Sequence, residues 1–277
     1  MMNALLSANR YRYLRGRQFF PAIIMTIFTA LMSLVITYFI SRAALALPPE
    51  SFSVLYSGGF YNFVVLRVER IEYLANLSIE QLMSSAFIGG FLAMLLAIFI
   101  PMFICGSFRS GFIQNAYIRG NSKFSIMLSY VISSVEIFFV IFVVYIASLT
   151  IFSSIIMGTA ISGEAILNLL PVFALQFFAH FVFLTVCISS AFMINKTPTC
   201  IVSLLFSVIM LPGLITTIDV ILQRGFSLSS LWIVNIIGLW SDVPPINFMF
   251  SFVVALITLF IAVGTALIMF VFSDIKQ

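Results

Sequence analysis

The sequence predicts an all-α integral membrane protein with six transmembrane helices. Two observations predict this class: 62% of the 277 residues are hydrophobic and only 8% are charged, and the apolar residues gather in long runs. A soluble domain carries about a quarter charged residues, whereas a helix that crosses a bilayer needs about 20 apolar residues. The mean hydropathy of +1.21 agrees with repeated membrane crossings.

Six apolar runs divide the chain into the spans of one transmembrane domain that covers residues 1–277. We expect the spans near residues 19–41, 84–106, 125–147, 166–194, 199–218 and 248–272. The apolar part of the first run is longer than the 7–15 residues typical of a signal peptide. The first span is therefore expected to remain in the protein as a membrane anchor.

Basic residues are distributed unequally between the two sides that these spans define. Of the 13 Lys and Arg residues, nine share the side of both termini, and three of the nine fall between the second and third spans. Because Lys and Arg in short loops are retained in the cytoplasm, we expect a multi-pass protein of the cell membrane with both termini cytoplasmic. The nine residues are Arg10, Arg12, Arg15, Arg17, Arg109, Arg119, Lys123, Lys196 and Lys276.

A basic cluster precedes the first span. It contains Arg10, Arg12, Arg15 and Arg17, interleaved with tyrosine and leucine, and this pattern is typical of an amphipathic interfacial helix. We interpret the four arginines as an interfacial anchor that anionic headgroups of the bilayer attract. A site for a specific partner is the alternative, and nucleic-acid binding is not expected.

Two long segments are predicted on the opposite, external side. The first is the external loop 42–83, expected to fold as a small cap. The second precedes the last span and includes residues 228–240, which are apolar but too few to cross a bilayer. We expect a re-entrant or interfacial hairpin here, with Trp232 and Trp240 as residue types that favour the membrane surface.

Two strongly ionisable residues, Glu136 and His180, lie deep in predicted spans. Ionisable groups are costly in lipid, so this pair is a candidate intramembrane polar site, and a proton relay is one hypothesis for it. The alternative hypothesis is structural: each group faces another helix and forms a hydrogen bond with a neighbouring hydroxyl or with the backbone.

Motifs for catalysis and for nucleotide binding are missing from the sequence. There is no GxxxxGK[ST] loop, no HExxH and no GxSxG, and the three cysteines show no CxxC spacing. With a single histidine, the chain also lacks a set of ligands for a catalytic metal. We therefore expect neither an enzyme nor a metal or cofactor site on this chain, and we interpret the cysteines as small buried apolar residues.

Between the second and third spans, residues 107–126 predict a short amphipathic helix parallel to the membrane. Phe112, Ala116 and Tyr117 are expected on its apolar face, with Arg109 and Arg119 flanking them. Asn121 or Ser122 can cap the helix that follows.

This stretch resembles the coupling-helix region of ABC-2 type permeases, in which a Gly, an Asn and a basic residue recur between the second and third spans. Ser107 stands where members of that family commonly carry a Glu. The closing Phe272-Ser-Asp274-Ile275 is similar to the end of the family's last span. The matching positions in the loop are Gly111, Asn115, Gly120, Ser122 and Lys123.

The resemblance implies a permease subunit of an ATP-driven exporter. Its expected partners are a cytoplasmic ABC ATPase subunit, which would bind ATP and Mg, and a second permease subunit of the same or a different chain. The preferred cargo is a hydrophobic or amphipathic peptide, bacteriocin or antibiotic, moved outward for export or self-immunity, while polysaccharide or lipid stays open. The residues implied in coupling to the ATPase are Arg109, Gly111, Phe112, Asn115, Tyr117, Arg119 and Lys123.

Two other functions compete with the exporter. An ion- or proton-coupled secondary transporter would use Glu136 and would need no ATPase. A membrane scaffold or sensor would form a stable complex without moving any cargo.

Overall fold

The computed structural model describes residues 2–15, 18–46, 78–222, 231–240 and 248–272. Within these ranges the chain is helical and contains no strand, which confirms the predicted all-α class. The helices are α1 (Met2–Arg15), α2 (Phe19–Ala46), α5 (Ile79–Ser85), α6 (Phe91–Arg109), α7 (Phe112–Ile118), α8 (Lys123–Met157), α9 (Gly163–Ile194), α10 (Thr197–Ile209), α11 (Leu211–Leu222), α12 (Ile233–Leu239) and α13 (Phe248–Phe272).

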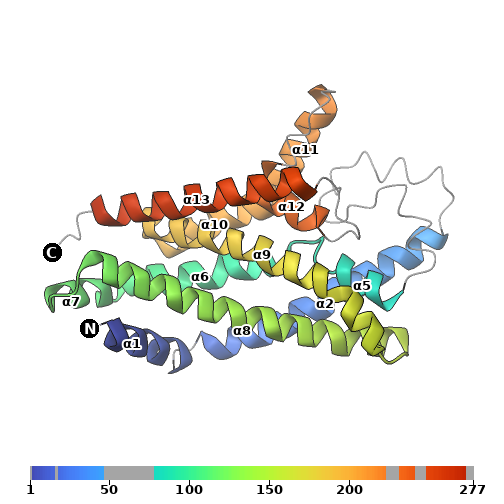
Figure 1. Cartoon of the computed structure of the whole chain (residues 1–277), viewed down its shortest axis with the longest axis horizontal. Helices are drawn as coiled ribbons and strands as arrows, with labels where there is room; N and C mark the ends of the chain where they lie inside the picture. Colours follow the sequence, from blue (N-terminus) through green and yellow to red (C-terminus); the bar gives the residue numbers. More distant parts are fainter. Residues whose placement is uncertain (1, 16–17, 47–77, 223–230, 241–247, 273–277) are drawn as a thin grey trace.

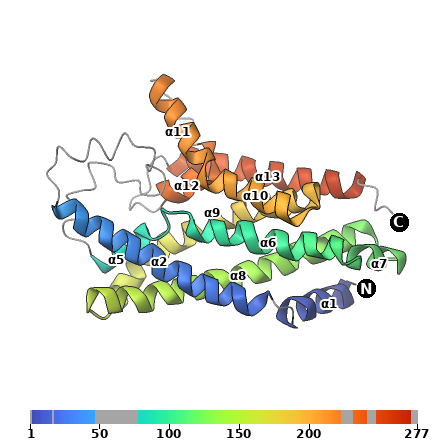
Figure 2. The same cartoon turned by 180° about the vertical axis from the view of Figure 1, so that it is seen from behind.

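The long helices lie side by side along the long axis of the molecule (Figures 1 and 2). One end of this bundle holds α1, α7 and the C-terminal end of α13, and we call it the α7 end. The opposite end, which we call the α5 end, holds α5, α12 and the connection between α8 and α9. In both views α11 projects away from the body of the bundle.

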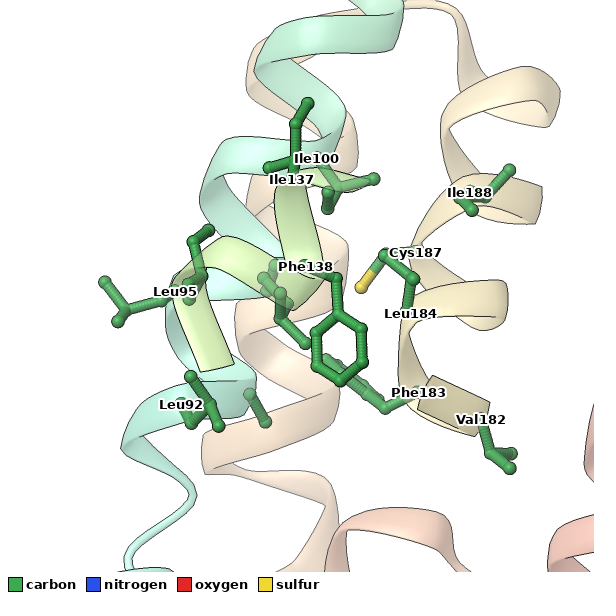
Figure 3. Packing of buried hydrophobic residues seen from close by; sticks show 14 of the residues in the cluster. Leu92, Leu95, Ile100, Ile137, Phe138, Val182, Phe183, Leu184, Cys187 and Ile188 are labelled. Atoms are coloured by element: carbon green, nitrogen blue, oxygen red, sulfur yellow. The ribbon is translucent and has the colours of Figure 1, made fainter. Parts of the chain in front are cut away.

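Helices α6 and α9 form the centre of the bundle. Of the 18 most apolar consecutive residues in each of these two helices, 61% are buried, against 28% in the corresponding stretches of α2 and α13. Helix α9 packs against α6, α8, α10, α12 and α13, and α6 packs against α2 and α10. Figure 3 shows side chains of α6, α8 and α9 meeting in this core, with Leu92, Phe138 and Phe183 among those labelled.

Five helices are long and apolar enough to cross a membrane: α2, α6, α8, α9 and α13. The fifth predicted span, residues 199–218, is not one helix, because it is divided into α10 with 13 residues and α11 with 12. The division falls beside Pro212, which has no backbone N–H to donate and whose ring crowds the preceding turn. The prediction of six continuous spans is therefore corrected at this position.

Local signals explain where the long helices begin and end. Ser122 and Ser162 cap α8 and α9, since their side chains accept backbone N–H groups three residues later. Gly158 ends α8 with φ of 67°. Helix α8 thus runs for 35 residues, well beyond the expected 125–147, and α6 begins at Phe91 rather than at residue 84.

The segment before the last helix contributes α12 to the bundle. Trp240, expected at the membrane surface, is completely buried and stacks on Phe178 and Phe252. The half-buried Trp232 donates its Nε1–H to the Ser207 carbonyl at 3.1 Å. The rest of the expected hairpin and most of the expected external loop 42–83 lie outside the described residues.

Candidate functional site

The candidate site is the α7 end, where α1, the last turn of α6, α7 and the first half of α8 meet (Figure 1). This assembly contains most of the residues that the sequence singled out. It joins two segments that are far apart in the sequence, because α1 packs along α8.

Glycines set both ends of α7. Gly111, at the joint with α6, has φ of 69°, and Gly120, on the way to α8, has φ of 84°. Residues that carry a side chain rarely adopt this left-handed backbone conformation, so glycine is the natural residue at both joints. The N–H groups of Gly120 and Asn121 donate to the carbonyls of Tyr117 and Ala116, a Schellman ending that stops the helix after two turns.

The two faces of α7 differ from the prediction by one residue. Ile113 and Ala116 are buried and Phe112 is half-buried, whereas Tyr117 is exposed. On a helix with 3.6 residues per turn, Tyr117 points about 140° away from Phe112. It therefore belongs to the outer face, beside Ile118, which is 72% exposed.

Of the expected coupling residues, the exposed ones lie on the outer face of α7 or directly beside it. Asn115, Tyr117 and Arg119 are exposed, and Arg109 is exposed at the end of α6. Lys123 is half-buried at the first position of α8. A seven-residue helix is too short to be stable alone, so its order depends on packing through the inner face.

Arg12 connects all parts of the site. Its Nη1 donates to Ser107 Oγ at 3.0 Å and to Tyr130 Oη at 3.3 Å, and its Nη2 donates to Ser110 Oγ at 3.4 Å. The guanidinium carbon lies 4.3 Å from the centre of the Phe112 ring, a cation–π distance. One side chain of α1 therefore contacts α6, α7, α8 and the turn between α6 and α7.

Two further contacts fix α1 against α8 and α6. The buried Asn9 donates its Nδ2–H to Ser129 Oγ at 3.1 Å. The ring of Tyr13 packs edge-on against Phe19 and Phe103, and burial raises the pKa of its hydroxyl above the ordinary value.

Glu136 is the partner of Arg10. The Arg10 Nε donates to Glu136 Oε2 at 2.9 Å, and Nη2 donates to the other carboxylate oxygen, so the pair is bidentate. The two side chains are 57% and 37% exposed, which places the pair on the outside of the bundle. The hydrogen bond to this carboxylate and its charge raise the pKa of Arg10.

His180 lies elsewhere, completely buried in the middle of α9. Its Nδ1 hydrogen-bonds to the Gln176 carbonyl at 2.7 Å, and its ring packs near Phe87 and Phe142. The structure does not join His180 to Glu136. Each forms its own structural contact, one with the backbone of its helix and one with α1.

The remaining predicted residues have simple positions. Arg15 is exposed on α1 and donates to Tyr11 Oη at 3.2 Å, while Arg17 lies outside the described residues. The three cysteines are free and buried, as predicted, and the Cys105 thiol contacts the Ala191 carbonyl at 3.5 Å. Among the described residues, no cluster of His, Cys, Asp and Glu has the arrangement to hold a metal ion.

Sequence reasoning missed the partners of Arg12, which are Ser107, Ser110 and Tyr130, and also the role of Asn121. The Asn121 side chain donates to the Ala116 carbonyl at 2.8 Å and so closes α7 rather than capping α8. Gly120, just after the helix, was a visible signal for that ending. No signal in the sequence connects Arg12 to hydroxyls about a hundred residues away.

The five long apolar helices define the class of protein: this is a multi-pass helical membrane protein. Comparisons with models of protein families, with curated proteins and with solved structures found no match to the chain.

Proposed function

We propose that the chain is the membrane-spanning permease subunit of an ATP-driven exporter of the ABC-2 type. The observation that carries this proposal is the two-sided construction of α7. Its inner face is packed and linked through Phe112 to Arg12, whereas its outer face presents Tyr117, Ile118 and Arg119 at the end of the bundle. Exposed apolar and arginine side chains on an ordered element are typical of a protein-binding surface.

The dimensions of α8 support a position of this surface outside the hydrocarbon layer. At about 1.5 Å per residue, 35 residues extend for roughly 50 Å, whereas the hydrocarbon core is about 30 Å thick. Glu136, which pairs with Arg10 of α1, lies in the first half of α8, toward the α7 end. The basic residues at this end favour the cytoplasmic side of the cell membrane, with both termini inside.

Coupling follows from the connections of α7. A cytoplasmic ABC ATPase that closes on ATP and Mg would shift α7. Short connections with one left-handed glycine each, residues 110–111 and 119–122, join α7 to α6 and to α8. Because α6 lies in the centre of the bundle against α9, a displacement of its end is passed to the packed core. The chain itself supplies no nucleotide-binding motif.

A second permease subunit completes the proposed assembly. Helices α2 and α13 are the least buried of the five long helices, and both expose large apolar side chains such as Phe20 and Phe260. These faces are available to lipid and to a second permease subunit of the same or a different chain. We propose a hydrophobic or amphipathic peptide, bacteriocin or antibiotic as cargo, in keeping with the apolar bundle.

The test of the exporter is the association with an ATPase. The full chain, tagged and purified from its own membranes in mild detergent, is expected to retain an ATPase with a GxxxxGK[ST] motif. Ile118→Asp and Arg119→Glu should weaken this association about tenfold or more, as expected for residues near the centre of an interface. Lys196→Glu is the matched control, since Lys196 is an exposed basic residue in the connection from α9 to α10 at the same end. Recovery of no ATPase, or equal weakening by the control, would refute the proposal.

Glu136→Gln separates the exporter from the competing secondary transporter. In the exporter, ATP-driven flux in proteoliposomes should change by less than about twofold, because a half-exposed ion pair contributes little. Arg10→Gln, which removes the other partner, should have the same small effect. A proton-coupled transporter would lose its flux with Glu136→Gln and would need no ATPase, and a scaffold or sensor would show no flux at all.

A further inference from the structure

Helix α1 has two faces of different chemistry. Leu5 and Asn9 are buried against the bundle, and Arg12 and Tyr13 are half-buried. The opposite face exposes small and polar residues in its first turns, then Arg10, Tyr11, Leu14 and Arg15 in its last two. The face is therefore both basic and apolar toward the end of the helix, where Tyr11 is 59% and Leu14 is 52% exposed.

The arginines of α1 fall into different classes, which the sequence did not distinguish. Arg10 is neutralised by the Glu136 carboxylate. Arg12 turns toward the protein and contacts hydroxyls and a ring. Arg15 lies on the outer face, where its guanidinium carbon is 5.2 Å from the centre of the Tyr11 ring and Nη1 donates to the Tyr11 hydroxyl. Helix α1 contains no Asp or Glu of its own.

Helix α2 follows α1 in the chain, and its first turns are exposed and apolar. Phe20 is 70% and Ile24 is 64% exposed there, in a helix that has the length and composition of a membrane span. Arg15 thus stands at the border between a basic interfacial helix and an apolar surface that faces lipid. Tyr11 and Leu14 lie within one turn of Arg15 and are suited to the boundary between headgroups and acyl chains.

We propose that this outer face of α1 binds the headgroups of anionic phospholipids, with Arg15 as the residue that contacts the phosphate and Tyr11 as the residue that positions it. Arg10 and Arg12 serve the protein's own packing instead. A guanidinium offers several N–H donors to phosphate oxygens, and Tyr11 keeps these donors in one place through the contacts described above. This proposal does not depend on transport or on an ATPase.

The test is lipid binding to the full chain in detergent, measured by native mass spectrometry during titration with phosphatidylglycerol or phosphatidylcholine. The wild-type chain should bind phosphatidylglycerol in preference to phosphatidylcholine. Arg15→Gln should weaken the binding of phosphatidylglycerol about fivefold, the factor expected for one basic residue at an anionic surface. Arg15→Lys should stay within about twofold of the wild type, since it keeps the charge, and Tyr11→Ala should fall between the two.

Lys196→Gln is the control for total charge, because it removes one exposed basic residue at the same end but away from α1. It should bind phosphatidylglycerol like the wild type. Excess inorganic phosphate should not displace the lipid, whose acyl chains contribute to the contact. Unchanged binding in Arg15→Gln with retained helicity, an equal loss in Lys196→Gln, or displacement by phosphate would each overturn the proposal.

Discussion

Replacing Arg12 with alanine is expected to release α1 from the rest of the α7 end. The substitution removes three hydrogen bonds from a charged donor and a cation–π contact with Phe112. Hydrogen bonds to charged groups and cation–π contacts together suggest a loss of about 2–3 kcal/mol in the docking of α1. Amide hydrogen exchange in residues 2–15 should then accelerate by roughly 30- to 150-fold, since exchange reports local opening.

Two variants make the Arg12 experiment specific. Arg12→Lys keeps the charge but lacks the planar fork, so it should recover only part of the protection. Arg15→Ala removes an arginine from the outer face of the same helix and should leave the exchange of α1 within about twofold of the wild type. If α1 is equally protected in Arg12→Ala, its docking does not depend on this residue. If the exporter proposal is correct, ATP-driven flux should fall together with that protection.

Replacing Phe138 with alanine is expected to produce the largest loss of stability in the core. Phe138 is completely buried between α8 and α9, with its ring centre 5.1 Å from that of Phe177 and 5.7 Å from that of Phe142 (Figure 3). In a membrane the unfolded chain is still surrounded by lipid, so moving the Phe138 side chain out of the core changes its hydrophobic free energy little. The cost of the substitution therefore comes from lost packing. A residual cavity of about 100 Å³ corresponds to about 2.4 kcal/mol.

Phe139 provides the matched control for Phe138. It is the next residue of α8 and has the same side chain, but it is 57% exposed on the outside of the bundle. Phe139→Ala should change the free energy of unfolding by less than about 0.5 kcal/mol. Unfolding of both variants in mixed micelles of increasing denaturing detergent measures the difference, and equal destabilisation would show that Phe138 does not face a packed core.

Proline shows why the number of spans could be predicted only in part. Three predicted spans contain a proline in their interior, at Pro101, Pro171 and Pro212. Helices α6 and α9 continue through Pro101 and Pro171. Of these three prolines, only Pro212 lies where one helix ends and another begins. A proline in an apolar helix is tolerated when neighbouring helices pack against it and satisfy the freed backbone groups. Pro101 is buried at the centre of the bundle, which hydropathy cannot reveal.

The candidate site was predictable where its signals are local. Glycines at 111 and 120 and a capping serine at 122 gave a short helix in the right place. The predicted orientation of that helix was wrong at Tyr117, because Ile113 rather than Tyr117 faces the bundle. Glu136 was found as an unusual residue, but its partner 126 positions away was not.

The sequence by itself determined the all-α membrane class and the positions of five long helices, because apolar runs of sufficient length have one stable form in a bilayer. It also determined the short helix between α6 and α8 through residues that act on their immediate neighbours. Only the tertiary structure decided which arginine of α1 serves packing and which faces outward. Such contacts depend on how α1, α6 and α8 lie against one another, and no local pattern specifies that arrangement.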